Sequence, residues 1–457
     1  MKRSIYLICL SFLILSLFSC SKSHSLDKTH NGPKNIILLI SDGFGFNHIE
    51  AANFYEFGKA GMQAYEHFPV TYAMSTFSLA NPEYKPELAW KIFEYVIQKP
   101  TDSAAAMTAI STGYKTYNGA IAVDSSKNNL ETILERVEKY GKATGVVTSV
   151  QFCHATPAAI IAHNENRNNY EAISKEMLTR CPLEVIMGTG HPFFDENGQT
   201  AADTTFKYVG GKETWEKLES GVLANDSDGD GESESWHLIQ DIVEFQRLEY
   251  GDTPERVVGI PKIRTTLQQD REGITEAPPF EVPLISTVPT LCEMAKAALN
   301  ILDNDPDGFF LMIEGGAIDW ASHDNQFGRM IEEQLDFNKT VEAVIGWLQR
   351  KSSWDETLVI VTADHECGYL TGPDSGPPPK KPANGEHATW NPVISRGKGK
   401  VPLMEWHHDG HTNSLIPFYA KGKCSELFHE YATQSDPIRG KYIDNTNIAH
   451  VLLSVFK

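Results

Sequence analysis

A serine at residue 103 stands in a setting that suits attack on phosphorus. Ser103 follows the carboxylate of Asp102 and opens a run of small helix-forming residues, 104–108. If this run is helical, the Ser103 hydroxyl lies at the helix N-terminus, beside unpaired backbone N–H groups and the positive end of the helix dipole. Such a position can present a nucleophile and hold an anionic product. The alternative is an ordinary cap on a buried, alanine-rich helix.

Acidic and histidine residues recur in spacings that metal sites use. Asp319 and His323 are four residues apart, so a helix would place both side chains on one face. Asp364 and His365 are adjacent and serve one metal only if the chain bends there, and His411 follows a polar loop. Carboxylates and imidazoles are ligands of zinc. Each residue alone is explained by a loop or a cap, but together they favour a metal site.

Four nearly continuous apolar runs predict buried strands that would position these residues. The runs span residues 35–40, 143–150, 308–313 and 357–362. Polar residues follow the runs in the order Asp42, then His154 and Thr156, then Glu314, then Asp364 and His365. Because the carboxyl ends of parallel strands meet at one edge of a sheet, we expect these side chains to converge there.

Helical stretches lie between and beside the strands, and the alternation predicts an α/β fold. They span residues 130–140, 169–178, 291–302 and 330–350. We expect a large central, mostly parallel sheet with helices on both faces. Residues 35–457 would form one catalytic domain, with loop insertions over the active-site rim at about residues 203–283 and 368–406.

Composition limits the classes of partner. The 457 residues carry a net charge of −20 and are 41% hydrophobic, so the chain is neither disordered nor a multispan membrane protein. The acidic balance argues against binding of nucleic acid as a polymer. An anionic substrate would require a locally positive site, built from metal ions or arginine.

The N-terminus reads as an export signal. Lys2 and Arg3 precede an apolar run, residues 5–18, that is short for a membrane span, and Cys20 follows it. We expect residues 1–19 to be a lipoprotein signal peptide, Cys20 to carry a lipid, and residues 20–34 to be a flexible tether. The protein would then be anchored by the lipid alone in the periplasm or cell envelope of a bacterium. The alternative is a plain cleaved signal.

Two further features stay open. Five cysteines remain after the signal and Cys20, which permits a disulfide in an exported protein without indicating a pairing. The acidic stretch from Asp226 to Asp230 resembles the start of a calcium loop, but His237 stands where an EF-hand places its bidentate glutamate. A solvated acidic turn is the alternative to calcium binding.

The chain resembles the alkaline phosphatase family in six segments that occur in the family's order, from about residue 35 onward. The segments are Ile40-Ser41-Asp42-Gly43, Thr101-Asp102-Ser103-Ala104, His154-Ala155-Thr156-Pro157 with Arg167, Glu314-Gly315 through Asp319 and His323, Thr362-Ala363-Asp364-His365, and His411-Thr412. This resemblance implies a metal-dependent hydrolase of small phosphate monoesters, and a homodimer.

The resemblance also implies a role for each matching residue. Ser103 would become phosphoserine, Arg167 would bind two phosphoryl oxygens and Asp102 would orient Arg167. Two zinc ions and one magnesium ion would be held by three groups: Asp319, His323 and His411 for one zinc; Asp42, Asp364 and His365 for the other zinc; and Asp42, Thr156 and Glu314 for magnesium.

Two positions depart from parts of the family. His154 stands where some members carry Asp, and Trp320 where others carry Lys or His. We expect both side chains beside the metals and the phosphate without acting as ligands. The identity and occupancy of the third metal therefore stay open.

The chemistry agrees with these roles. Phosphoryl transfer needs charge neutralisation and in-line positioning, and two metal ions with Arg167 supply positive charge that the acidic chain otherwise lacks. Two other functions are alternatives to a phosphomonoesterase: that of a related diesterase, sulfatase or phosphomutase, and that of a binding protein built on a phosphatase that has lost its activity. Ala104 and Ala105 after Ser103 do not form a sulfatase signature, and a decayed enzyme would be expected to lack a ligand or the nucleophile.

Overall fold

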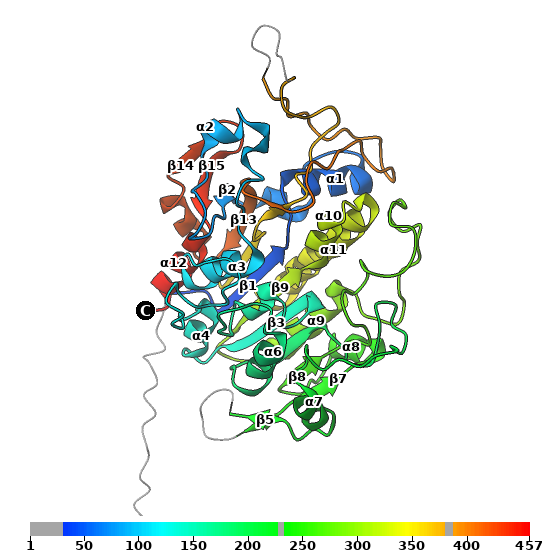
Figure 1. Cartoon of the computed structure of the whole chain (residues 1–457). Coiled ribbons are helices and arrows are strands. Elements are labelled where there is room, and N and C mark those ends of the chain that lie inside the picture. The colour runs from blue at the N-terminus through cyan, green and yellow to red at the C-terminus, as the bar shows by residue number, and fades with distance from the viewer. Residues whose placement is uncertain (1–30, 227–232, 380–386) are drawn as a thin grey trace, which may run out of the picture.

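The apolar runs predicted as strands lie side by side in the middle of an 11-stranded sheet (Figure 1). The computed structural model describes residues 31–226, 233–379 and 387–457. Across the sheet the strands are β14 (Gln434–Asp436), β15 (Gly440–Asp444), β2 (Val70–Ser75), β13 (Ile416–Gly422), β10 (Thr357–Thr362), β1 (Asn35–Ser41), β9 (Phe309–Gly315), β3 (Ala143–Gln151), β4 (Val185–Thr189), β8 (Val257–Gly259) and β7 (His237–Ile239). Every residue of β1, β3, β9 and β10 is buried, as expected for strands covered on both faces.

The sheet is mostly parallel, which confirms the predicted fold class. From β10 through β1, β9, β3, β4, β8 and β7, each strand runs parallel to its neighbours within that series. Antiparallel pairing is confined to β13, which opposes both β10 and β2, and to the pair of β14 with β15. The carboxyl ends of β1, β3, β9 and β10 therefore lie at one edge.

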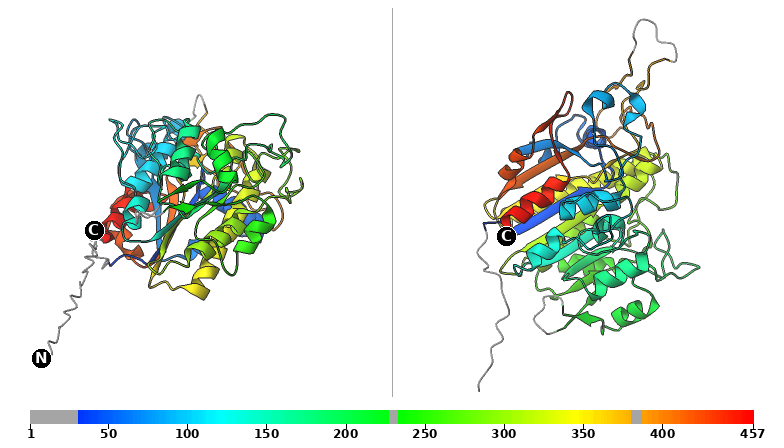
Figure 2. Two further views of the ribbon diagram at one scale, coloured as in Figure 1. Left: turned by 90° about the horizontal axis from the view of Figure 1, so that it is seen from below. Right: turned by 60° about the vertical axis from the view of Figure 1, so that its left-hand side comes forward.

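Helices cover both faces of the sheet, as the views in Figures 1 and 2 show together. One face carries α3 (Ser103–Thr112), α4 (Ile133–Glu138), α5 (Ala155–Ala158), α6 (Tyr170–Thr179) and α12 (Thr446–Val455). The other carries α1 (Phe46–Phe57), α8 (Ile242–Leu248), α9 (Leu291–Leu302), α10 (Ala317–His323) and α11 (Phe327–Lys351). The core is one large cluster between these layers, with a smaller cluster around Tyr84, Phe93 and Tyr369.

The predicted helices are present, with shifted ends in three of the four cases. The helix predicted over 291–302 matches α9, α6 is shifted by one residue, and α11 extends its prediction at both ends. The prediction over 130–140 was too long, because a capping box starts α4 later: Thr132 Oγ1 accepts from Glu135 N–H, and the Glu135 carboxylate accepts from Thr132 N–H.

The two predicted insertions differ in kind. Segment 203–283 contains α7 (Lys212–Glu219), the short strands β5 (Ala224–Asn225) and β6 (Glu234–Ser235), and α8, but it also supplies β7 and β8 to the main sheet. Its polar composition hid these two short strands, which form one end of the sheet. Segment 368–406 is an irregular excursion held by isolated bridges such as Thr371 with Glu405, and it lies at the top of Figure 1.

Several expectations fall outside the described residues. They are the signal peptide at 1–19, Cys20, the tether up to residue 30, and residues 227–230 of the candidate calcium loop. The cysteines that the structure describes are Cys153, Cys181, Cys292, Cys367 and Cys424, and all five are free thiols.

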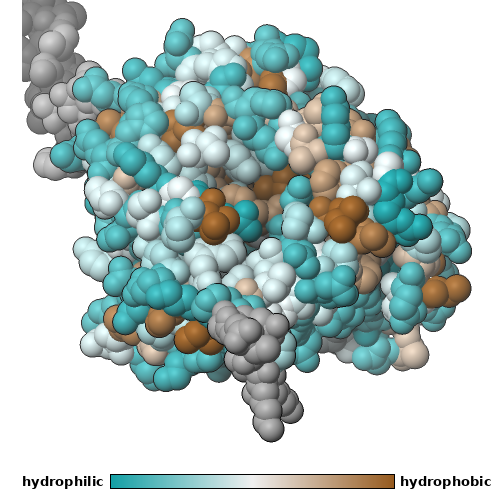
Figure 3. Space-filling view, turned by 90° about the horizontal axis from the view of Figure 1, so that it is seen from above, coloured by the Kyte–Doolittle hydropathy of each residue, from teal (hydrophilic) through white to brown (hydrophobic). Residues whose placement is uncertain are grey.

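Surface polarity follows the expected pattern for a folded domain. Seen from above, hydrophilic side chains cover most of the face, and hydrophobic ones flank a hollow near its centre (Figure 3). Within the described residues, none of the helices is both long enough and apolar enough to cross a bilayer.

Candidate active site

Ser103 is the first residue of α3 and is almost fully buried. Asp102 forms the N-cap, and its Oδ1 accepts from the backbone N–H of Ala105 at 3.0 Å. The Ser103 hydroxyl oxygen lies 3.1 Å from His365 Nε2. The helix therefore directs the hydroxyl and its free N-terminal N–H groups toward the strand edge where His365 lies.

Arg167 is held beside this hydroxyl by two neighbours. Its Nη1 donates to Asp102 Oδ2 at 3.0 Å, and its Nη2 lies 3.3 Å from His154 Nε2. Asp102 Oδ2 also accepts from Gly119 N–H at 3.0 Å. Burial and the adjacent guanidinium lower the pKa of His154 to about 3, so this ring is neutral. The Trp320 ring packs edge-on against His154, with centroids 5.7 Å apart.

Sheet register brings the carboxylates of three strand ends together. Ile40 of β1 pairs with both Glu314 of β9 and Thr362 of β10, which sets Asp42, Glu314 and Asp364 at one edge. Gly43 turns the chain there with φ +75°, and its N–H donates to Asp364 Oδ1 at 3.3 Å. A Cβ on Gly43 would lie 2.7 Å from Asp319 Cα, so only glycine fits this close approach.

Asp319, His323 and His411 converge from α10 and from β12 (His411–Thr412). His323 Nδ1 faces the carbonyl oxygen of Asp409 at 2.6 Å, and His411 Nδ1 faces that of Thr101 at 2.9 Å. These contacts leave both Nε2 atoms facing inward, 3.0 Å apart. Asp319 Oδ2 lies 3.4 Å from His323 Nε2, and Asp319 Oδ1 lies 3.5 Å from His411 Nε2. In metal-binding histidines, the ring nitrogen that does not bind the metal typically donates a hydrogen bond to a group such as a backbone carbonyl oxygen.

The remaining predicted ligands lie on the strand side of this group. His365 Nε2 is 3.2 Å from Asp364 Oδ2 and 3.6 Å from Asp42 Oδ1, so the chain bends after β10 as two adjacent ligands require. Thr156 Oγ1 donates to Asp42 Oδ2 at 3.3 Å, and Glu314 lies on the same side. All the predicted ligand residues therefore meet in one region, which is buried except at His323 and His411, where it reaches the surface.

The buried atoms of this region fit cations. Five of them have no hydrogen-bond partner among the described residues: Asp42 Oδ1, Glu314 Oε1, Asp319 Oδ1, Asp364 Oδ2 and His365 Nδ1. Burial and the carboxylates of Asp364 and Asp319 raise the pKa of Asp42 well above its usual value, and burial raises the pKa of Glu314 to about 7. Clustered carboxylates of this kind are stable as anions only when positive charge compensates them.

Two site residues were missed from the sequence. Cys367 Sγ lies in one group with ligand atoms of Asp319, His323 and His411, all within 4.8 Å of one another. Its strand β11 (Glu366–Cys367) pairs Cys367 with His411, and no local spacing such as CxxC marks this cysteine in the sequence. Thr148 of β3 donates its hydroxyl to Glu314 Oε2, and only the register of β3 with β9 reveals that contact.

The chain is similar to known proteins over most of its length. The family model described as alkaline phosphatase matches residues 33–395. Alkaline phosphatase of Escherichia coli K12 is 31% identical over 409 residues, which cover 85% of this chain and 81% of that protein. Alkaline phosphatase 3 of Bacillus subtilis is 31% identical over 349 residues, which cover 75% of this chain but only 63% of that protein.

Solved structures share the fold. The cold-active alkaline phosphatase of a Shewanella species superposes with a TM-score of 0.65 at 22% identity, covering 93% of this chain and 100% of that one. A variant of the alkaline phosphatase from the Antarctic bacterium TAB5, with Glu in place of one histidine and described with Mg bound in its M3 site, gives a TM-score of 0.62 at 25% identity. It covers 94% of this chain and 99% of that one.

Proposed function

Because this chain belongs to the alkaline phosphatase family and is a phosphatase, we propose that it hydrolyses phosphate monoesters through a phosphoserine intermediate on Ser103. The observation that carries this proposal is the position of the Ser103 hydroxyl, at a helix N-terminus and 3.1 Å from His365, next to Arg167. A nucleophile, an anion-binding guanidinium and a cluster of metal-type ligands together suit phosphoryl transfer.

In this proposal Ser103 is the nucleophile and Arg167 binds the phosphoryl group. Ser103 Oγ attacks phosphorus and the bond to the leaving alcohol oxygen breaks, so the phosphoryl group moves to Ser103 and the alcohol leaves with a proton. Arg167 binds two phosphoryl oxygens with its forked guanidinium, while Asp102 and His154 fix its plane. Water then attacks the phosphoserine, which restores the Ser103 hydroxyl and releases inorganic phosphate.

Three metal ions would complete this site. We assign Asp319, His323 and His411 to one zinc, Asp42, Asp364 and His365 to a second zinc, and Asp42, Thr156 and Glu314 to magnesium. When bound, the ions supply the positive charge that favours the ionised Ser103 oxygen and the leaving oxygen. The mixed imidazole and carboxylate groups suit zinc, and the all-oxygen group suits magnesium. The TAB5 variant, in which Glu replaces a histidine and Mg is bound in the M3 site, supports a third metal site whose occupancy depends on the residue at a histidine position.

Turnover of a monoester against a diester tests the proposal. We expect the purified protein to hydrolyse p-nitrophenyl phosphate far faster than bis-p-nitrophenyl phosphate, to lose this activity on chelation, and to regain it with zinc and magnesium. Dominant diester turnover would move the chain to the diesterase class, and absence of turnover in metal-loaded protein would favour a binding protein.

Ser103→Ala tests the nucleophile. This variant should lose most turnover while keeping its metal content, because Ser103 contributes no charge to the ligand groups. Ser111→Ala is the matched control on α3, since the Ser111 hydroxyl donates to the Ala159 carbonyl, away from the ligands. A phosphoserine trapped at low pH on Ser103, and absent from the Ala variant, would identify the intermediate directly.

Export, anchoring and assembly are further proposals. The charged start, the apolar run and Cys20 support a bacterial lipoprotein of the cell envelope, and the family resemblance supports a homodimer. Cys20→Ser should release the protein from the membrane fraction if Cys20 carries the lipid. Light scattering on the purified protein would give the number of chains.

A further inference from the structure

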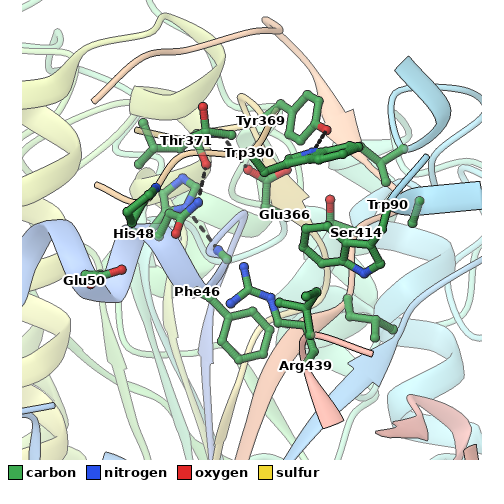
Figure 4. Close-up of a pocket in the computed structure, with 18 of the residues that line it drawn as sticks. Phe46, His48, Glu50, Trp90, Glu366, Tyr369, Thr371, Trp390, Ser414 and Arg439 are labelled. Carbon is green, nitrogen blue, oxygen red and sulfur yellow. Dashed lines mark hydrogen bonds between the residues drawn. The ribbon is translucent and has the colours of Figure 1, made fainter. Parts of the chain in front are cut away.

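A second cavity of about 260 Å³ lies apart from the residues assigned to catalysis and to metals, none of which lines it. Its walls come from α1 and the residue before it, from segment 77–100, from segment 368–406 and from the turn before β15. They also include Glu366 of β11, which directly follows His365, and Ser414 and Leu415. Five aromatic side chains line the cavity together with polar ones: Phe46, Trp90, Tyr369 and Trp390, which Figure 4 shows, and Tyr84. The volume is slightly below the range usual for small-molecule sites, so it suits one small ring system.

Hydrogen bonds on their outer edges hold several of these rings. Asp436 is buried, and its Oδ2 accepts from Tyr84 Oη at 2.8 Å and from Trp90 Nε1 at 2.9 Å. Trp390 Nε1 donates to Tyr369 Oη at 2.8 Å. The polar atoms of these rings are thus already paired within the protein, and apolar ring surface is left for the cavity.

Asp436 also places a cation in the cavity. Its Oδ1 accepts from the backbone N–H groups of Ile438 at 2.8 Å and Arg439 at 2.7 Å, which fixes the turn that carries Arg439. The guanidinium carbon of Arg439 lies 4.1 Å from the centroid of the Phe46 ring and 5.9 Å from that of Trp90. Figure 4 shows the guanidinium directed into the space between the aromatic walls.

The Arg439 guanidinium has no protein acceptor among the described residues. The nearest turn carboxylate, Asp436, is already engaged by the two rings and the two backbone N–H groups. Glu50 of α1 and Glu366 of β11 also line the cavity (Figure 4). Glu50 forms no ion pair with Arg439, although the two charges attract each other, and the Glu366 carboxylate already accepts from Leu370 N–H and Thr412 Oγ1. A forked donor left free between aromatic faces is suited to a planar carboxylate.

We propose that this cavity binds a small aromatic carboxylic acid, whose ring packs against Trp90 and Trp390 and whose carboxylate pairs with Arg439. Offset and edge-to-face ring contacts favour an aromatic ligand over an aliphatic one of the same size. The carboxylate would satisfy the free guanidinium donors, so an aromatic amine of the same shape should be rejected.

Calorimetric titration of the metal-loaded protein with indole-3-acetate tests this site, with tryptamine as the cationic ligand of matched ring and length. We expect one indole-3-acetate per chain, and binding of tryptamine at least about tenfold weaker. Saturating inorganic phosphate should leave the indole-3-acetate affinity unchanged, because phosphate occupies the region of Ser103 and Arg167.

Arg439→Met, which keeps an apolar stem of similar length, should weaken indole-3-acetate at least about tenfold. Arg396→Met is the matched control, because Arg396 is exposed on segment 368–406 and lies outside the cavity. Retained phosphatase activity of both variants would show that they fold. The ligand comparison needs no variant and decides the question if Arg439→Met fails to fold.

Three outcomes would overturn the proposal. Equal affinity for tryptamine would remove the role of Arg439, and displacement of indole-3-acetate by phosphate would move the ligand to the catalytic site. Binding that weakens as protein concentration rises, in step with dimer formation by light scattering, would show that a second copy of the chain fills the cavity.

Discussion

At the scale of single residues, Asp102 links the start of α3 to the phosphate-binding arginine. One of its oxygens caps the helix, and the other accepts from Gly119 N–H and Arg167. The two functions can be separated, because an asparagine keeps a capping oxygen but loses the charge that pairs with the guanidinium.

We therefore expect Asp102→Asn to weaken inhibition by inorganic phosphate about tenfold, and to keep the cap on α3 while Gly119 N–H loses its acceptor. Asp102→Ala should show the same loss of phosphate affinity and also lose about 1 kcal/mol of stability through the missing cap. Competition kinetics and thermal unfolding of both variants measure these effects. Wild-type phosphate affinity in Asp102→Asn would mean that Arg167 needs no anionic partner.

His154 governs the affinity for the third ion in our assignment. Its Nδ1 is buried and has no hydrogen-bond partner in the described part of the chain, and one of its ring nitrogens lies within 4.8 Å of carboxylate oxygens of Asp42 and Glu314. His154→Asp exchanges a neutral ring for an oxygen ligand with negative charge, which magnesium prefers. We expect this variant to retain more magnesium after dialysis, as measured by elemental analysis. Unchanged magnesium content in both proteins would place the ion elsewhere.

The sequence indicated which side chains meet at the candidate site better than it indicated their supporting contacts. Asp319 with His323 follows from helix periodicity, and Asp42 and Glu314 follow from strand ends, so short-range pattern was enough to find them. Thr148 and Cys367 could not be found in this way, because their contacts depend on the pairing of β3 with β9 and of β11 with β12. Such register is fixed by the whole sheet and leaves no local signal in the sequence.

At the scale of elements, α11 carries a buried carboxyl group outside the catalytic region. Glu333 Oε1 has no hydrogen-bond partner among the residues that the structure describes, and burial together with Asp336 and Glu332 raises the pKa of Glu333 to about 8 from its usual 4.5. Arg271 opposes this shift, but it is already paired with Glu332 at 2.8 Å. The folded protein therefore holds Glu333 protonated near neutral pH.

The sign of the resulting pH dependence follows from linkage. At pH values below about 4.5 the folded and unfolded states both bind the proton, so Glu333 makes no pH-dependent contribution to stability. Between about pH 4.5 and 8 the unfolded state releases the proton and the folded state keeps it, so the stability of the fold decreases as pH rises. We expect Glu333→Gln to be more stable than wild type at pH 9, by up to a few kcal/mol, and nearly equal at pH 4. Denaturant unfolding at both pH values measures this, with the exposed Glu219→Gln as control. A pH-independent difference would contradict it.

The bounds of a helix or strand could be predicted where residues at its ends, such as a capping box, mark them in the sequence. The matching ends of α9 reflect its capping box at Thr290 and Glu293, which any reader of the sequence can see. In contrast, β7 and β8 have only three residues each, and they form strands by pairing with the sheet next to β4. Because the surrounding residues are polar, the sequence suggested a loop there. Short edge strands depend on a sheet that is already formed.

At the scale of the whole molecule, one sheet connects distant parts of the chain. β15 near the C-terminus pairs with β2, and β1 at the start of the described residues pairs with β10, so both ends of the described region are tied into the layer that carries the proposed metal ligands. This connectivity supports the proposal of one catalytic domain over residues 35–457. It also means that charge repulsion among the buried ligands acts on the stability of the entire fold.

Removal of metal should therefore destabilise the protein as a whole. An ion held at one hundred times its Kd contributes about 2.7 kcal/mol to the folded state, which for a chain of this length corresponds to about 3 °C in Tm. If three ions bind, chelation should lower Tm by roughly 8 °C, and zinc with magnesium should restore it. Scanning calorimetry measures the shift. Ser103→Ala is the informative control, since it should keep the full shift while lacking turnover; an unchanged Tm after complete chelation would mean that the buried carboxylates are neutralised by protons instead of cations.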